Sequence, residues 1–225
     1  MALVNFNSDQ NIGTTSCDGY ASRFVSNSTW FSLRGSPGTA GSATSGTPSP
    51  RILTGTTSGR FTGIYRSFFL FDTSSIPDDA TITSAKLCVQ VTTKSEQIPG
   101  SSYAVVNCTT GSNTNIAKTD YQLAGTTLLS DAILGADIVL STSGVFNEFI
   151  LNSTGLDYIN KTGVTKLCLR EATYDIADSP PSWLSNKDCR ISITFAENSS
   201  YKPYLEVTYT EAGGNVNNDN FFLVI

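Results

Sequence analysis

The chain has 225 residues, of which only 15% are charged, and its formal net charge is −5 at pH 7. This length suits one large all-β domain or two small domains. A negative chain without a basic cluster argues against nucleic acid or an anionic membrane as the partner. Residues 1–10 lack a cationic start and an apolar core, so no signal peptide is expected. No apolar run approaches the length needed for membrane insertion.

Taken in chain order, the sequence predicts three parts: an N-terminal arm (1–18), a β-sandwich domain (19–210), and a linker with an apolar C-terminal tail (211–225). The arm is polar and irregular. Residues 19–33 then predict one or two early strands. The Gly/Ser/Thr/Pro-rich stretch 36–59, in which Arg51 is the only charge, predicts a solvated loop.

The strongest pattern of the sequence lies between Ile64 and Val91. Its first half ends in the four large apolar residues 68–71, so both faces of that strand need cover, from a facing sheet and from another layer. The turn residues 73–79 follow, and the second half alternates, with Leu87 and Val89 on one face. This pattern predicts a hairpin that seeds a β-sandwich.

Further strands are expected at 102–109, 146–151, 164–170, 190–195 and 204–209, with a short turn near Tyr121. Ser153 or Thr154 is expected to cap a short helix that stops at Gly163. The predicted fold is all-β: an antiparallel jelly-roll-like β-sandwich with one short helix and a C-terminal extension. Its predicted core residues are Phe69, Phe71, Leu87, Val89, Leu167, Leu169 and Leu205.

A family resemblance rests on the segment Arg66-Ser67-Phe68-Phe69-Leu70-Phe71-Asp72, followed by Ile76-Pro77 and by Ala80 to Leu87. This order resembles the DNRLRE-type domains, which are jelly-roll-like β-sandwich modules, some of them grouped with carbohydrate-binding modules. It is more similar still to a short stand-alone form found among tailed-phage and metagenomic virion-type proteins. The segments 155–163 and 203–209 fit that form too, so the resemblance spans roughly residues 15–210. It implies a fold more than a function.

The five cysteines form no Cys-x-x-Cys pair, and the chain has no histidine, which argues against a zinc site. Packed free thiols and one or two disulfides both remain open. Without histidine there is no Ser-His-Asp or Cys-His arrangement, and no two carboxylates are paired by the sequence. The prediction is that the protein is not an enzyme.

Two groups of acids can supply oxygen ligands to a calcium ion, and no other cofactor is expected. Asp78 and Asp79 lie in the turn after the apolar run 68–71, and Asp175 and Asp178 lie in the loop 171–188, which we call the late loop. No spacing matches a dedicated calcium loop, so solvated turn acids are the alternative.

The late loop also gives the best candidate for glycan binding, which needs an exposed aromatic platform beside hydrogen-bonding groups. Tyr174 and Trp183 are the predicted platform, with Asp175 and Asp178 beside them. The competing interpretation is that Trp183 plugs the end of the sandwich.

The last signal is the tail, which consists of Phe221, Phe222, Leu223, Val224 and Ile225. Five apolar residues at a chain end are costly to expose to water. The tail is predicted to add to a sheet edge of another chain and to anchor the protein in an assembly. Folding back onto its own sandwich is the alternative.

These observations predict a non-enzymatic structural protein of a virus particle, either a phage capsid decoration protein or a fibre or tail subunit. Its partners would be other virion proteins or copies of itself, and its location the virion or the extracellular space. The alternative is a carbohydrate-binding module that attaches to cell-surface or matrix polysaccharide. A subunit of a non-viral extracellular filament is a third hypothesis.

Overall fold

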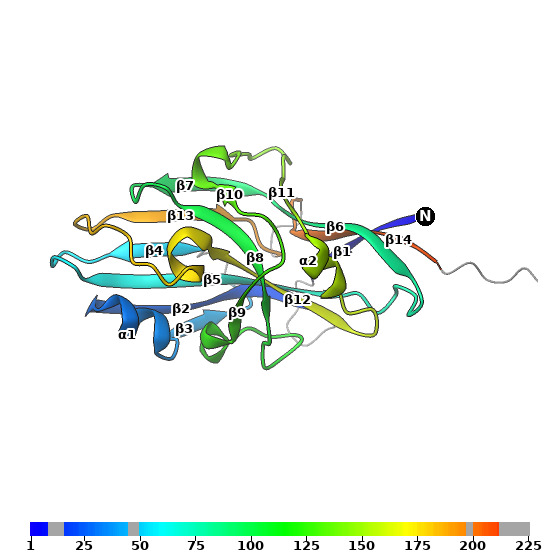
Figure 1. Cartoon of the computed structure of the whole chain (residues 1–225), viewed down its shortest axis with the longest axis horizontal. Helices are drawn as coiled ribbons and strands as arrows, with labels where there is room; N and C mark the ends of the chain where they lie inside the picture. Colours follow the sequence, from blue (N-terminus) through cyan, green and yellow to red (C-terminus); the bar gives the residue numbers. More distant parts are fainter. Residues whose placement is uncertain (9–15, 45–49, 197–199, 212–225) are drawn as a thin grey trace, which may run out of the picture.

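The computed structural model describes residues 1–8, 16–44, 50–196 and 200–211. Their strands form two antiparallel sheets (Figure 1). The four-stranded sheet has the order β1 (Ala2–Asn7), β14 (Tyr204–Thr210), β6 (Thr81–Val89), β11 (Asn147–Ile150). The main path of the ten-stranded sheet is β10 (Ile133–Leu134), β8 (Ser102–Cys108), β12 (Val164–Glu171), β5 (Phe61–Asp72), β4 (Arg51–Thr54), β13 (Asp188–Ile193), β7 (Val91–Glu96). Off this path, β2 (Cys17–Ser28) pairs with β5 and β3 (Ala40–Ser42), and β9 (Ala124–Leu128) pairs with β8.

The predicted fold class is confirmed: the chain is mostly β, with antiparallel sheets and short helical segments. All seven predicted core residues are fully buried. The helical segments are α1 (Trp30–Gly35), η1 (Lys118–Leu123), η2 (Gly135–Asp137), α2 (Ser153–Asp157) and η3 (Ala172–Ile176). No helix among the described residues is long and apolar enough to cross a membrane.

Residues 68–71 of strand β5 are buried on both faces, as their sequence predicts. Phe69 and Phe71 lie in the core between the two sheets, where they join Leu87 and Leu205. Phe68 and Leu70 point the other way, into a second cluster on the opposite face of the large sheet. We call these the inter-sheet core and the outer core. Alternating side chains of one strand therefore enter two separate cores, which explains the unbroken apolar run.

The predicted hairpin is wrong, because β5 and β6 do not pair with each other. β5 lies in the ten-stranded sheet and β6 in the four-stranded sheet, so residues 73–80 cross from one sheet to the other. Leu87 and Val89 consequently share the inter-sheet core with Phe69 and Phe71. A short turn between two apolar strands is compatible with either arrangement.

The outer core is covered by helical segments. Buried side chains of α1 (Trp30 and Leu33) and of η1 (Tyr121) belong to it. The prediction of strand through Leu33 is wrong, because β2 ends at Ser28 and the Thr29 side chain accepts a hydrogen bond from Ser32 N, which starts the helix. Trp30 packs edge-on against Phe61, with ring centroids 5.1 Å apart.

Three further expectations need correction. Residues Ala2–Asn7 are not an irregular arm, because they pair with β14 and bury Phe6. The stretch 36–59 is not only a loop: it contains β3 and β4, and β4 pairs with both β5 and β13. The short helix is capped by Asn152, whose side chain accepts from Gly155 N, rather than by Ser153 or Thr154. The predicted tail, 221–225, lies outside the described residues.

All five cysteines are free and buried, which confirms the packed-thiol interpretation. Cys168 lies in the outer core, while its neighbours Leu167 and Leu169 lie in the inter-sheet core. Burial raises the pKa of the Cys168 thiol to about 12 and that of Cys88 to about 11. These thiols are therefore protonated packing groups at neutral pH.

Candidate functional site

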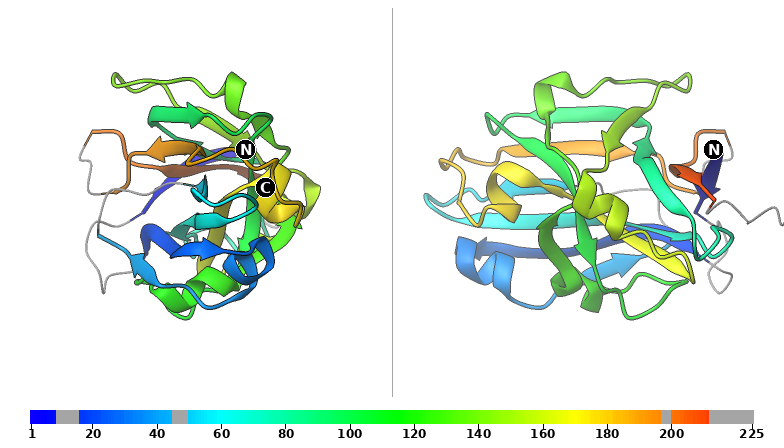
Figure 2. Two further views of the ribbon diagram at one scale, coloured as in Figure 1. Left: turned by 90° about the vertical axis from the view of Figure 1, so that its left-hand side faces the viewer. Right: turned by 45° about the vertical axis from the view of Figure 1, so that its right-hand side comes forward.

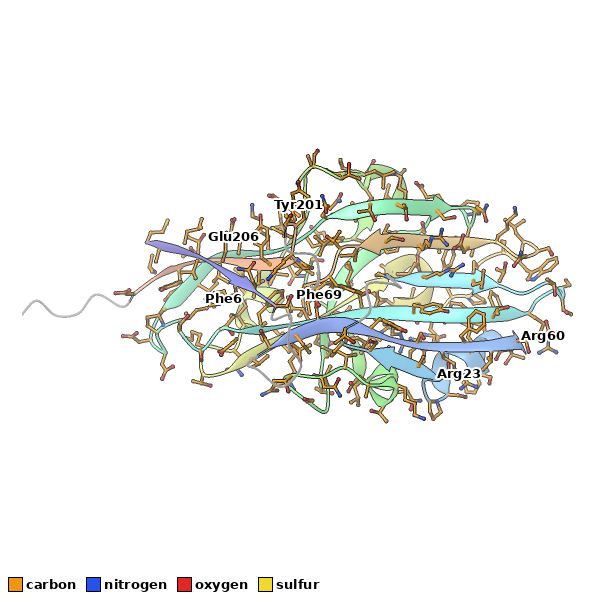
Figure 3. All side chains as sticks on the ribbon, turned by 180° about the vertical axis from the view of Figure 1, so that it is seen from behind. Phe6, Arg23, Arg60, Phe69, Tyr201 and Glu206 are labelled. Atoms are coloured by element: carbon orange, nitrogen blue, oxygen red, sulfur yellow. The ribbon has the colours of Figure 1, made fainter. Side chains whose placement is uncertain are left out.

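One face of the large sheet is open over part of its length. The β5 face that carries Phe69 and Phe71 continues along the strand through Ser67, Tyr65 and Gly63. Tyr65 is half-buried, and on the neighbouring strand Phe24 is 49% exposed. Seen from behind, the strands β7 (green), β13 (orange), β4 (light cyan), β5 (cyan) and β2 (blue) lie side by side (Figure 3). We call the solvent-facing side of these five strands the open face.

A β-bulge decides which side chains of β5 reach the open face. In the pairing with β4, Leu53 lies opposite Gly63, but Thr54 lies opposite Phe61, so β5 has one extra residue here. The bulge reverses the alternation. Phe61 is thereby turned into the outer core, where it meets Trp30, while Gly63 and Tyr65 stay on the open face.

Three aromatic rings stand next to one another on the open face. Tyr20 and Phe24 are four residues apart on β2, so they share a face, and Tyr65 lies on the adjacent strand. The Tyr65 ring centroid is 6.4 Å from that of Tyr20 and 6.4 Å from that of Phe24, with tilted planes. Burial raises the pKa of Tyr65, so its hydroxyl stays protonated and can both donate and accept hydrogen bonds at neutral pH.

Gly63 lies directly opposite Phe24 and leaves room for these rings. A Cβ atom at Gly63 would come within 3.1 Å of Phe24 Cδ2 and 3.1 Å of Tyr65 Cε2. Both rings therefore lean over the glycine and cover its backbone, in the manner of cross-strand aromatic rescue. A larger residue here would force the two rings apart.

Hydrogen-bonding and charged side chains continue the aromatic cluster across the sheet. The registers place Ser22 opposite Tyr65, Tyr65 opposite Arg51, Arg51 opposite Arg190, and Arg190 opposite Ser95. This row crosses five strands, which corresponds to a length of about 19 Å at the usual spacing between strands. The Arg51 guanidinium carbon lies 5.9 Å from the Tyr65 ring centroid, a cation–π distance.

One carboxylate holds the two arginines of this row together. Arg51 Nε lies 2.9 Å from Asp188 Oδ2, and Arg190 Nη1 donates to the same oxygen at 3.0 Å. Ser95 Oγ donates to Asp188 Oδ1 at 2.7 Å. The Asp188 side chain is almost fully buried, whereas that of Arg190 is 39% exposed. The open face therefore presents an aromatic end beside an arginine end.

The residues of the glycan site predicted in the late loop make contacts within the protein. Asp175 is fully buried and holds Arg66 and Arg170, so it is unavailable to a ligand and its assignment was wrong. Tyr174 is partly buried against the outer core, and its hydroxyl donates to Pro99 O. Trp183 Nε1 donates to Gly55 O at 3.2 Å at the β4–β5 turn.

Asp178, the fourth predicted glycan residue, is exposed but has two protein partners. It accepts from Trp30 Nε1 at 3.2 Å and pairs with Arg34 at 3.1 Å. Asp178 thus ties the late loop to α1. In Figures 1 and 2, α1 (blue) and the late loop (yellow to orange) lie at the same end of the molecule as the β4–β5 turn.

Asp175 belongs to a buried charge cluster beneath η3. Arg66 donates to it through Nε and Nη2 at 2.9 and 2.7 Å, and Arg170 through Nε at 2.9 Å, with Arg170 Nη2 2.8 Å from Oδ1. The Arg66 guanidinium lies 4.1 Å above the Tyr121 ring. The two arginines hold the pKa of Asp175 well below its usual range. Because each charged group is enclosed by partners, this cluster fixes η3 on the sheet.

The predicted calcium ligands lie in the connection between the sheets. Asp78 and Asp79 are both exposed, and Lys161 Nζ donates to the Asp78 backbone carbonyl and to Ala80 O. Within the described ranges, no three His, Cys, Asp or Glu side chains converge as a metal-binding group. A calcium ion at these two acids stays a prediction.

Sequence reasoning missed the open face, although part of its signal is visible. Tyr20, Ser22 and Phe24 alternate with residues of the other face, as do Gly63, Tyr65 and Ser67. Alternation identifies these faces, but the register that aligns them with Arg51 and Arg190 comes from pairing between distant strands.

Comparison with known proteins assigns no family to the chain. A scan against known protein families finds no family that matches the chain, and a search of curated proteins finds no match either. The resemblance to DNRLRE-type domains therefore stays a prediction, and the candidate site rests on its own residues.

Proposed function

We propose that the protein is a non-enzymatic glycan-binding module and that the open face is its binding surface. The observation that carries this proposal is the cluster of Tyr20, Phe24 and Tyr65 on a solvent-facing sheet, continued by a row of polar side chains. Sugars present apolar C–H faces together with a dense set of hydroxyls. Aromatic rings beside hydrogen-bond donors and acceptors match both properties.

The site is also preorganised, which lowers the entropic cost of binding. Its side chains stand on paired strands rather than on loops, and cross-strand contacts hold the rings and guanidinium groups in place. An extended chain of several sugars would lie along the row from Tyr65 to Ser95, because Ser22 is buried beneath the face. This choice develops the carbohydrate-binding hypothesis of the sequence on a different surface from the late loop.

A glycan array of purified wild-type protein tests the proposal. We expect retention on at least one polysaccharide and a loss of about tenfold or more in affinity for Phe24→Ala and Tyr65→Ala, which corresponds to about 1.4 kcal/mol. Phe31→Ala is the matched control, because Phe31 is 84% exposed but lies on α1, away from the open face.

The outcomes separate the competing surfaces. Absence of binding to every glycan contradicts the proposal. If Trp183→Ala abolishes binding while Phe24→Ala and Tyr65→Ala retain it, the site is in the late loop instead.

A structural role in a virus particle is the second candidate, and one observation favours it. Ile150 on β11 and Val139, Leu140 and Val145 in the preceding loop are each about half exposed or more. Asn147 holds this loop against β11 through Val139 N and O, at 2.8 and 2.9 Å. Exposed apolar residues on β11 and on the loop before it suit a contact between subunits. Light scattering should show a smaller assembly for Ile150→Lys if this candidate is correct, and an unchanged mass would count against it.

A further inference from the structure

We propose that the open face selects glycans that carry acidic groups, and that Arg190, supported by Arg51, binds the carboxylate or sulfate. This inference rests on the proposed glycan-binding function and specifies its ligand class. It comes from the charge balance of the arginine end of the row.

At the arginine end of the row, Arg51, Arg190 and Asp188 are the charged side chains. Asp18, on the same face of β2, lies opposite Phe69 and is fully buried, where it accepts hydrogen bonds from Ser8 Oγ and Ala196 N. Arg51 and Arg190 occupy directly opposite positions on β4 and β13. Like charges placed opposite each other destabilise a sheet unless an anion lies between them. Asp188 supplies one negative charge for two guanidinium groups, so the arginine end carries a net charge of +1.

The excess charge is directed towards solvent at Arg190. Its contact with Asp188 uses Nη1, and its side chain is 39% exposed, compared with 23% for Arg51. The planar guanidinium therefore has N–H groups that face outwards and fit an acidic oxygen pair. Asp188 is fixed from the other side by Ser95 and is almost fully buried, so it orients the arginines without exposing its own charge to a ligand.

The aromatic end decides between kinds of anion. If Arg190 binds the carboxylate or sulfate of a sugar, the ring of that sugar would lie next to Arg51, on the side where Arg51 contacts Tyr65. The net charge of −5 opposes every polyanion alike, so the contact of a sugar ring with the aromatic end is what favours an acidic glycan over a polyphosphate chain. The arrangement favours single acidic groups spaced along a sugar polymer.

The experiment compares glycans that differ only in charge. Polygalacturonate and its methyl ester form one matched pair, and sulfated and desulfated forms of one glycosaminoglycan form another. Affinities are measured by isothermal titration at low and at physiological salt. We expect wild-type protein to bind the acidic member of at least one pair about tenfold more tightly, with a preference that decreases as salt increases.

Arg190→Gln should abolish this preference while binding of the neutral member persists. Arg60→Gln removes the same charge at the β4–β5 turn and should leave the preference intact (Figure 3). Equal affinity of the wild type for both members of every pair overturns the inference but leaves glycan binding standing. Absence of binding to acidic and neutral members alike overturns the proposed function as well. If Arg190→Gln does not fold, the wild-type comparison within each pair decides alone.

Discussion

The buried charge cluster beneath η3 gives the sharpest stability prediction, through the substitution Asp175→Asn. Asp175 is fully buried and engages Arg66 and Arg170 through both carboxylate oxygens, at 2.7 to 2.9 Å. The amide keeps the shape of the side chain but removes its charge. It also turns an NH2 group towards guanidinium groups that only donate.

The expected loss of unfolding free energy in Asp175→Asn follows from the charges that remain buried. Two guanidinium groups stay buried without their shared anion, and breaking a buried ion pair in this way costs about 3 to 5 kcal/mol. Urea titration should show this loss of unfolding free energy. For a chain of this size, each kcal/mol lowers the melting temperature by about 2 to 4 °C. The melting temperature should therefore fall by roughly 10 °C.

Asp178→Asn is the matched control on the same loop. Asp178 pairs with Arg34, but its side chain is 55% exposed, and exposed pairs contribute about 0 to 1 kcal/mol. Its backbone has a φ of 53°, a left-handed conformation that asparagine tolerates well. A cost below about 1 kcal/mol for Asp175→Asn, or equal costs for the two variants, would refute the assigned role of the cluster.

Three other predictions concern the cores and the tail. Phe71→Ala should lower the unfolding free energy by about 3 to 5 kcal/mol in a denaturant titration, because Phe71 is fully buried between the sheets; a loss under about 1 kcal/mol would show that the core is misplaced. The five buried thiols should react with a thiol reagent only after denaturant is added, and rapid labelling of the native protein would contradict their packing. Deleting residues 221–225 should leave thermal unfolding of the isolated domain nearly unchanged and abolish assembly, whereas loss of monomer stability with intact assembly would place the tail in its own core.

The sequence predicted the core because the core residues carry their own pattern. The alternation around Leu87 and the two-sided apolar run at 68–71 each have few structural interpretations. Strand β4 carries no such pattern: four residues lie in a Gly- and Ser-rich segment, and they form a strand because β5 and β13 offer hydrogen bonds on both sides. Pairing that comes from neighbours is not visible in the segment itself.

The candidate site was less predictable for a related reason. Its residues come from β2, β4, β5, β13 and β7, and their alignment depends on four registers and a bulge at Thr62. Asp175 was misassigned because its neighbours Ala177, Asp178 and Ser179 are polar or small, which is typical of a solvated loop. The two arginines that draw Asp175 inside lie on separate strands, and sequence spacing does not relate them to the loop.

The last prediction concerns pH and rests on Glu171, which starts η3 and so positions Asp175. Its side chain accepts hydrogen bonds from the backbone N–H groups of Thr173, Tyr174 and Asp175. Burial raises its pKa from 4.5 to about 7, although these hydrogen bonds oppose the increase. The folded protein thus holds this proton more tightly than the unfolded chain does, and the unfolding free energy should fall as pH rises between about 4.5 and 7. A difference of 2.5 in pKa corresponds to about 3 kcal/mol over the whole window.

The depressed pKa of Asp175 acts below about pH 4, so it does not disturb measurements between pH 5 and 8. Urea titrations across this range should show the decline in the wild type and in Glu148→Gln, which removes an exposed carboxylate on β11. Glu171→Gln should flatten it and should be less stable than the wild type at pH 5, because its NH2 group faces N–H donors. Parallel curves for the wild type and Glu171→Gln would show that Glu171 does not control the pH response of the fold.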